Sequence, residues 1–143
     1  MPSIDRIITV QKLANEVWEF MADFCTTEQW DPPTVRTIRE SGDGGVGTVY
    51  RNTSKVLGRE VDIIYTVLEF DPPRMLRLHG ETSSMTAVDT IEVDDTDAGT
   101  RVHYSVDFSL NGVAKLFEPL LPIALKNLGD SAEKQLRQCL EAL

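Results

Sequence analysis

The chain has 143 residues, with 14 Lys or Arg, 23 Asp or Glu and a net charge of −9. This length suits one domain with a sizeable hydrophobic core, so we expect a single domain over residues 1–143. The acidic balance disfavours nucleic acids and anionic membranes as partners, because both bind through clustered basic side chains.

The start of the chain, its apolar runs and its cysteines together indicate a cytoplasmic protein. The first residues lack the basic stretch followed by an apolar segment that marks a secretory signal. Pro119 and Pro122 interrupt the longest apolar run, which falls short of the roughly 18 residues of a spanning helix, so we expect no integral membrane segment. Cys25 and Cys139 are too few for a disulfide framework, and we expect two reduced thiols.

The first predicted elements are a strand over residues 4–10, rich in β-branched side chains, and a helix over residues 14–24. Within the helix, apolar residues recur at spacings of three and four, which is typical of a helix with one buried face. A short helical turn over residues 26–30 follows, and the sequence Asp31-Pro32-Pro33 ends it.

Six further strands are predicted between turns rich in Gly, Pro, Ser and Asp. They cover residues 34–40, 47–53, 59–70, 74–80, 85–93 and 100–110. The last is the clearest, because apolar and polar residues alternate strictly from Val102 to Leu110. This alternation indicates a sheet with one packed face and one solvated face.

A long amphipathic helix is predicted at the C-terminus, where apolar residues repeat at threes and fours up to Leu143. Pro119 and Pro122 suit a first helical turn, so we expect the regular helix to begin near them. The predicted fold class is α+β: a curled seven-stranded antiparallel sheet wraps around this long helix, with one or two short helices after the first strand.

Several motifs in this order carry a resemblance to a known family. They are the first strand leading into residues 14–23, Trp30 before Pro32-Pro33, the glycines of residues 45–48, residues 69–74 (EFDPPR), residues 99–102 (GTRV) and Gln135-Leu136. With this element order the chain resembles the START-like (SRPBCC) helix-grip superfamily, and within it the polyketide cyclase/dehydrase and lipid transport family. The resemblance implies a cavity between sheet and C-terminal helix that holds an apolar or aromatic small molecule. It also implies that some relatives are cyclases or aromatases.

Strand parity and position predict which side chains line such a cavity. Neighbouring antiparallel strands place same-face side chains about 5 Å apart on one concave surface. Trp30 and the apolar residues 113–121 are expected at the mouth, the latter as a flap. The predicted ligand-binding residues are Trp30, Tyr65, Leu76, Leu78, Ala87, Asp89, Ile91, Tyr104, Val106, Phe108, Phe117 and Leu121.

Asp89 is the one candidate acid in this set. Inside the cavity it would be partly desolvated, its pKa would rise, and it could bind or protonate a ligand group. Alternatively, Asp89 lies at the open rim or forms a structural ion pair with Arg51, Arg59 or Arg77. We favour this structural alternative, since ion pairs also perturb pKa values.

Other catalytic or metal-binding patterns find little support. Strand parity places His79 and His103 on the solvated face, and no Cys/His/carboxylate spacing indicates a metal site. The sequence has no nucleophile elbow, and residues 42–48 lack the lysine of a phosphate loop. We therefore expect no metal and no cofactor.

Three functions follow from these observations. The first is a binding or carrier protein for a hydrophobic or aromatic small molecule, either a monomer or a homodimer. The second is an enzyme of the cyclase/aromatase or dehydratase kind, with Asp89 and either Tyr65 or Tyr104 as its acid–base set. The third is a protein-interaction module, which applies if the concave face is packed solidly.

Overall fold

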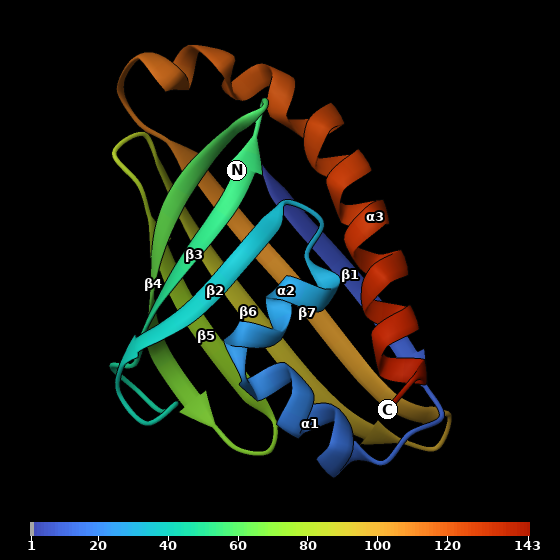
Figure 1. The fold of residues 1–143 in the computed structure, drawn as a ribbon. Helices are drawn as coiled ribbons and strands as arrows, with labels where there is room; N and C mark the ends of the chain where they lie inside the picture. The colour runs from blue at the N-terminus through green and yellow to red at the C-terminus, as the bar shows by residue number, and fades with distance from the viewer. Residues whose placement is uncertain (1) are drawn as a thin grey trace.

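Seven antiparallel strands form one curled sheet in the computed structural model, which describes residues 2–143 (Figure 1). The strand order is β1-β7-β6-β5-β4-β3-β2, so β2 to β7 form a meander and β1 adds to its far edge. The strands are β1 (Ser3–Val10), β2 (Thr34–Ser41), β3 (Val49–Val56), β4 (Arg59–Asp71), β5 (Met75–Glu81), β6 (Met85–Thr96) and β7 (Gly99–Leu110).

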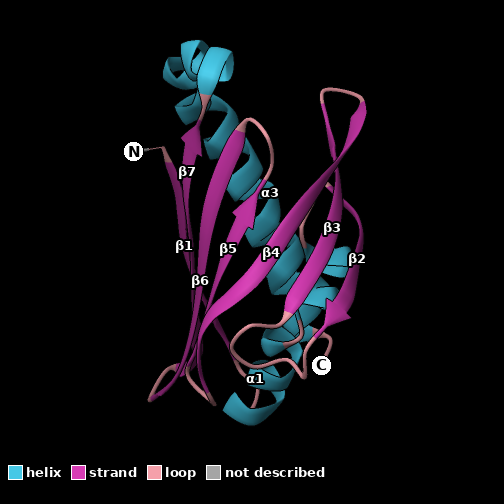
Figure 2. Ribbon diagram, turned by 90° about the vertical axis from the view of Figure 1, so that its left-hand side faces the viewer, coloured by secondary structure: helices cyan, strands magenta, loops and turns pink. Residues whose placement is uncertain are grey.

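The helices follow β1 and β7. After β1 come α1 (Ala14–Ala22), a 3₁₀ turn η1 (Phe24–Thr26) and α2 (Thr27–Trp30), and after β7 come a 3₁₀ segment η2 (Gly112–Leu120) and the long α3 (Leu121–Glu141). Pro122 lies in the first turn of α3, where its missing N–H costs no helical hydrogen bond. The sheet curls around α3 (Figure 2), and the predicted α+β helix-grip architecture is confirmed.

The boundaries of β3 and β6 differ from the predicted ones by more than one residue. β3 runs from Val49 to Val56, because the glycines before it form a turn in which Gly42, Gly44 and Gly47 have positive φ. β6 continues to Thr96 instead of ending at Val93, because Asp94 and Asp95 pair with Arg101 and Thr100 of β7. The acidic segment is therefore mostly strand, and only residues 97–98 turn the chain.

The C-terminal helix is held to β1 by its apolar stripe and by one close approach. Leu125, Ala132, Leu136 and Leu140 are buried along one face of α3. A Cβ built on Gly129 would lie 2.8 Å from the Arg6 guanidinium, so this glycine lets β1 and its arginine approach the helix. Arg6 then bonds Asp130 at 2.9 Å, beside the stripe.

The hydrophobic core fills one end of the space inside the sheet. There α1 packs on β6, and Trp18 lies against Phe70 with ring centroids 5.8 Å apart. Trp30 is also fully buried. At the other end β7 is followed by η2, none of whose side chains is buried, and then by α3.

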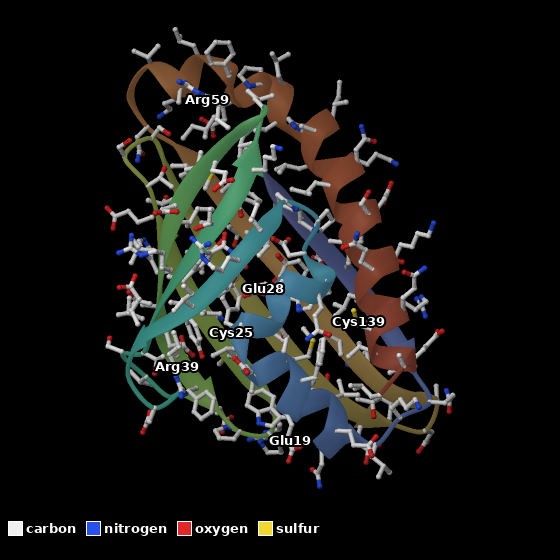
Figure 3. All side chains as sticks on the ribbon, in the orientation of Figure 1. Glu19, Cys25, Glu28, Arg39, Arg59 and Cys139 are labelled. Atoms are coloured by element: carbon white, nitrogen blue, oxygen red, sulfur yellow. The ribbon has the colours of Figure 1, made fainter. Side chains whose placement is uncertain are left out.

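Residues outside the core agree with the predicted parity of the strands. His103 lies on the outer face and contacts Asp5 of β1. Both cysteines are free and half-buried, Cys25 in η1 and Cys139 in α3 (Figure 3). No helix within residues 2–143 combines the length and apolarity that crossing a bilayer requires.

Candidate functional site

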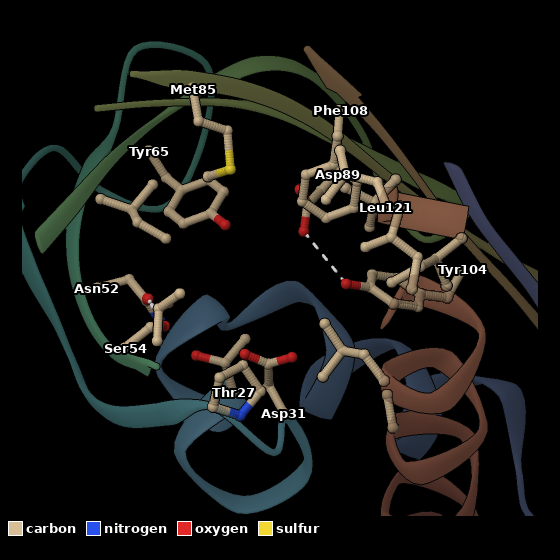
Figure 4. Close-up of a pocket in the computed structure, with 18 of the residues that line it drawn as sticks. Thr27, Asp31, Asn52, Ser54, Tyr65, Met85, Asp89, Tyr104, Phe108 and Leu121 are labelled. Atoms are coloured by element: carbon tan, nitrogen blue, oxygen red, sulfur yellow. Dashed lines mark hydrogen bonds between the residues drawn. The ribbon is translucent and has the colours of Figure 1, made fainter. Parts of the chain in front are cut away.

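A cavity of about 200 Å³ lies between the inner face of the sheet and the first half of α3 (Figure 4). Polar lining groups come from Thr27, Asp31, Asn52, Ser54, Tyr65, Asp89 and Tyr104. The rest of the lining is apolar and consists of Ile4, Phe24, Pro33, Val56, Ile63, Met85, Val106, Phe108, Leu110, Leu121, Leu125, Leu128 and Ala132.

Asp89 projects from β6 into this cavity and is only 3% exposed. Its Oδ2 accepts a long hydrogen bond of 3.5 Å from the Tyr104 hydroxyl, while its buried Oδ1 has no partner. Burial raises the pKa of Asp89 to about 8, with a further contribution from the negative charge of Asp31, and the Tyr104 bond partly opposes both. A carboxyl group in this setting is mostly protonated at neutral pH.

The favoured structural alternative, in which Asp89 lies at the open rim or pairs with an arginine, is wrong. Arg51 pairs with Glu40 and with Asp62, and Arg77 pairs with Glu69 at 2.6 Å. Arg59 is exposed at the start of β4 (Figure 3). These arginines sit on the outer face or at strand ends, so none reaches a side chain that β6 directs inward.

A second carboxyl group, which sequence analysis missed, faces Asp89 across the cavity. Asp31 directly follows α2, and its carboxylate points into the cavity from the side opposite Asp89 (Figure 4). Desolvation raises the pKa of Asp31 to about 6, and a hydrogen bond from Thr34 partly opposes this rise. The sequence presents Asp31 only as a helix-ending residue before two prolines, and strand parity does not apply to such a turn.

A chain of hydrogen bonds holds Asp31 in place. Ser54 donates to Asn52 at 2.5 Å, Asn52 donates to Thr34 at 2.9 Å, and Thr34 donates to Asp31 Oδ2 at 2.5 Å. Asn52 also donates to Thr37 at 2.9 Å. Each buried polar group in this network has a partner, so the wall that carries Asp31 is rigid.

Two tyrosines complete the polar part of the lining. Desolvation, followed by the nearby charge of Asp89, raises the pKa of both Tyr65 and Tyr104 well above the usual value, so both hydroxyls stay neutral. The Tyr65 ring lies directly over Gly80, where a Cβ would come within 2.6 Å of it, and 4.8 Å from the Phe24 ring. Its hydroxyl points into the cavity (Figure 4).

Half of the predicted ligand-binding residues line the cavity and half do not. Those in the lining are Tyr65, Asp89, Tyr104, Val106, Phe108 and Leu121. Those outside it are Trp30, Leu76, Leu78, Ala87, Ile91 and Phe117.

The residues outside the lining have physical reasons to lie there. Trp30 is 1% exposed and packs edge-on against Tyr104 within the hydrophobic core, with ring centroids 5.1 Å apart. Leu76, Leu78 and Ile91 are completely buried in the hydrophobic core, and the short side chain of Ala87 does not reach the cavity.

Only part of the expected flap meets the cavity. Phe117 is 60% exposed on η2, and Leu116 and Leu120 are exposed beside it. Leu121, where α3 begins, is half-buried and lines the cavity. Within residues 2–143, no cluster of three or more His, Cys, Asp or Glu side chains is placed to hold a metal ion.

A family model described as polyketide cyclase / dehydrase and lipid transport matches residues 1–141 of the sequence. The chain belongs to this family. Membership confirms the resemblance drawn from the motifs. The description covers both catalysis and transport, so hydrophobic ligand binding and cyclase activity are both functions that the family suggests. No curated protein matches the chain by sequence.

Solved structures share the fold of this family member at low sequence identity. A protein from Thermus thermophilus has a TM-score of 0.78 and 16% identity, and the match covers 96% of this chain and 95% of that one. A START superfamily protein from Mycobacterium smegmatis has a TM-score of 0.70 and 14% identity, over 96% and 98% of the two chains.

The di-domain ARO/CYC protein BexL matches with a TM-score of 0.65 and 15% identity. The match covers 94% of this chain but 49% of BexL. At such identities the likeness to all three structures shows the fold alone.

Proposed function

We propose that this family member binds a hydrophobic or aromatic small molecule in the cavity between the sheet and α3. The observation that carries the proposal is the cavity itself, whose walls are mainly apolar and whose polar groups are few and convergent. A ligand that buries about 200 Å² of apolar surface there gains roughly 5 kcal/mol before the costs of association.

Dye displacement tests this proposal. Nile red, a neutral dye that fluoresces in apolar surroundings, should bind the native protein and be displaced by decanol. Leu121→Trp should weaken binding, because Leu121 lines the cavity at the start of α3 and a larger side chain there takes up ligand space. Ala124→Trp is the matched control, since Ala124 lies on the same helix but is exposed. Absence of dye binding, or equal affinity of both variants for it, overturns the proposal.

A second candidate function is acid–base catalysis, which one observation favours. Asp89 is a buried carboxyl with a pKa raised to about 8, and it contacts the Tyr104 hydroxyl inside the cavity. In a dehydration the protonated Asp89 carboxyl can donate to the leaving hydroxyl, while the ionised carboxylate of Asp31 in the same lining accepts the proton lost from the neighbouring carbon.

Loss of water from 4-hydroxy-4-phenylbutan-2-one gives a conjugated enone that absorbs in the ultraviolet, so turnover of this probe tests the second function. Asp89→Asn should abolish any turnover, whereas Asp97→Asn, the same substitution in the exposed β6–β7 turn, should leave it intact. A rate unchanged by Asp89→Asn rejects the acid–base role.

A further inference from the structure

Within residues 2–143, the cavity lining contains acidic side chains but no basic ones. Among the described residues that line it, Asp31 and Asp89 are acidic and none is Lys, Arg or His. The helix that closes the cavity, α3, contributes only Leu121, Leu125, Leu128 and Ala132, so no titratable group faces the two carboxyls from that side. The remaining titratable groups that face them are the hydroxyls of Tyr65 and Tyr104.

We propose that the cavity selects ligands whose polar group is a protonated amine, which is held between the carboxyl groups of Asp31 and Asp89. The inference rests on the proposed binding function and names the ligand class for that same cavity. The apolar part of such a ligand contacts the surrounding apolar walls.

The position of Asp89 is the first argument. Its Oδ1 is buried without any hydrogen-bond partner, and its Oδ2 has only the long bond from Tyr104. A buried polar atom without a partner costs about 1–3 kcal/mol, which a donor on a ligand recovers. An ammonium group has three N–H donors and no acceptor, so it satisfies carboxylate oxygens better than a hydroxyl does.

The position of Asp31 opposite is the second argument. Its Oδ2 is taken by Thr34, while the carboxylate faces the cavity (Figure 4). Because the hydrogen-bonded chain from Ser54 and Asn52 fixes this side chain, Asp31 cannot swing out to solvent without breaking that chain. Two carboxyl groups thus face one small space from opposite walls, and a cationic group between them allows both to be ionised, whereas without it one of them holds a proton.

The other classes of head group fit less well. A carboxylate ligand brings a further negative charge beside two acidic groups, with no basic side chain in the lining to pair with it. A neutral alcohol can bond to Asp89 but leaves the charge of Asp31 uncompensated. The rings of Tyr65 and Tyr104 add a further attraction for a cation that lies over either face.

Uptake of an amine should release a proton. With pKa values of about 6 for Asp31 and about 8 for Asp89, the pair carries one proton near pH 7. A bound ammonium favours ionisation of both groups, so about one proton leaves the protein for each amine bound. A neutral ligand has no such effect.

Three probes that differ only in the head group test the inference: decylamine, decanol and decanoate, each in competition with Nile red near pH 7. We expect decylamine to bind about 30-fold more tightly than decanol, the lower end of what a buried charge pair contributes, and decanoate to bind least. Asp31→Asn and Asp89→Asn should each reduce this preference, while Asp97→Asn should retain it. Thermal unfolding of each variant shows whether it is folded.

Calorimetry provides a readout that does not depend on affinity. Decylamine titrated at pH 7 in phosphate and in Tris, whose ionisation enthalpies differ, should give different heats, and decanol should give the same heat in both. Asp89→Asn should remove the difference.

The outcomes separate the two proposals. Failure of all three probes and of Nile red to bind overturns the binding function itself. Binding of decanol as tightly as decylamine, or of decanoate more tightly than either, overturns the amine selectivity and leaves the binding function standing. Equal heats for decylamine in the two buffers also count against the amine site.

Discussion

Replacing Asp89 with asparagine should stabilise the protein, and increasingly so as the pH rises. Asp89 has a pKa of about 8 in the folded chain against an ordinary value of 3.8, because burial disfavours the ionised carboxylate. The folded state therefore holds a proton that the unfolded state releases as the pH rises above about 4. The burial of Asp89 therefore costs no free energy of unfolding below about pH 4, and the cost grows progressively until the pH reaches about 8.

The size of the effect follows from the same values. At about 1.4 kcal/mol for each pH unit, a rise from 3.8 to about 8 corresponds to about 5–6 kcal/mol at full ionisation. Entry of water into the cavity lowers this cost, so we expect at least about 2 kcal/mol between pH 5 and pH 8. That is a large part of the roughly 5–15 kcal/mol typical of a folded domain.

Urea unfolding followed by tryptophan fluorescence measures this effect, because Trp18 and Trp30 are both buried. The free energies of unfolding of wild type and Asp89→Asn should be similar near pH 4 and should diverge up to about pH 8 in favour of the variant. Asp97→Asn should follow the wild-type curve. Parallel curves for wild type and Asp89→Asn would refute the placement of a desolvated carboxyl in the cavity.

Two further changes test the packing that shapes the cavity. Leu136→Ala should cost about 2–5 kcal/mol, because Leu136 is fully buried on the stripe of α3, and a loss below about 1 kcal/mol in a urea titration would contradict that placement. Gly80→Ala should destabilise by about 1–3 kcal/mol and alter Nile red affinity, because the added Cβ would lie 2.6 Å from the Tyr65 ring. Unchanged stability and dye binding in Gly80→Ala would mean that Tyr65 moves freely.

Local periodicity was enough to predict the elements and the face that each one buries. The alternation along β7 places Val102, Tyr104 and Val106 inward, and the spacing of apolar residues defines the buried stripe of α3. Parity likewise directed Asp89 inward, together with Ala87 and Ile91. These predictions succeed because a strand or helix repeats over a few residues, so neighbours in sequence determine which side faces the core.

The composition of the site depended on contacts between distant segments. Whether an inward residue lines the cavity or packs in the core depends on how far α1 and Trp30 fill the space. On the same strand, Asp89 therefore lines the cavity, whereas Ile91 packs in the core. Asp31 enters the site because a turn carries it there and because Asn52 of β3 and Thr34 of β2 meet beside it. No local repeat encodes such a turn.

The amino-acid sequence by itself therefore determined the fold class, the family and the inward direction of Asp89. The tertiary structure alone decided that Asp89 has no arginine partner, that Asp31 faces it, and that both lie in an apolar cavity. The physical reason is that the electrostatic environment of a side chain depends on the groups that lie near it in the folded chain. The pKa of Asp89 depends on burial, on Asp31 and on Tyr104, groups that the chain brings together only when the sheet has curled around α3.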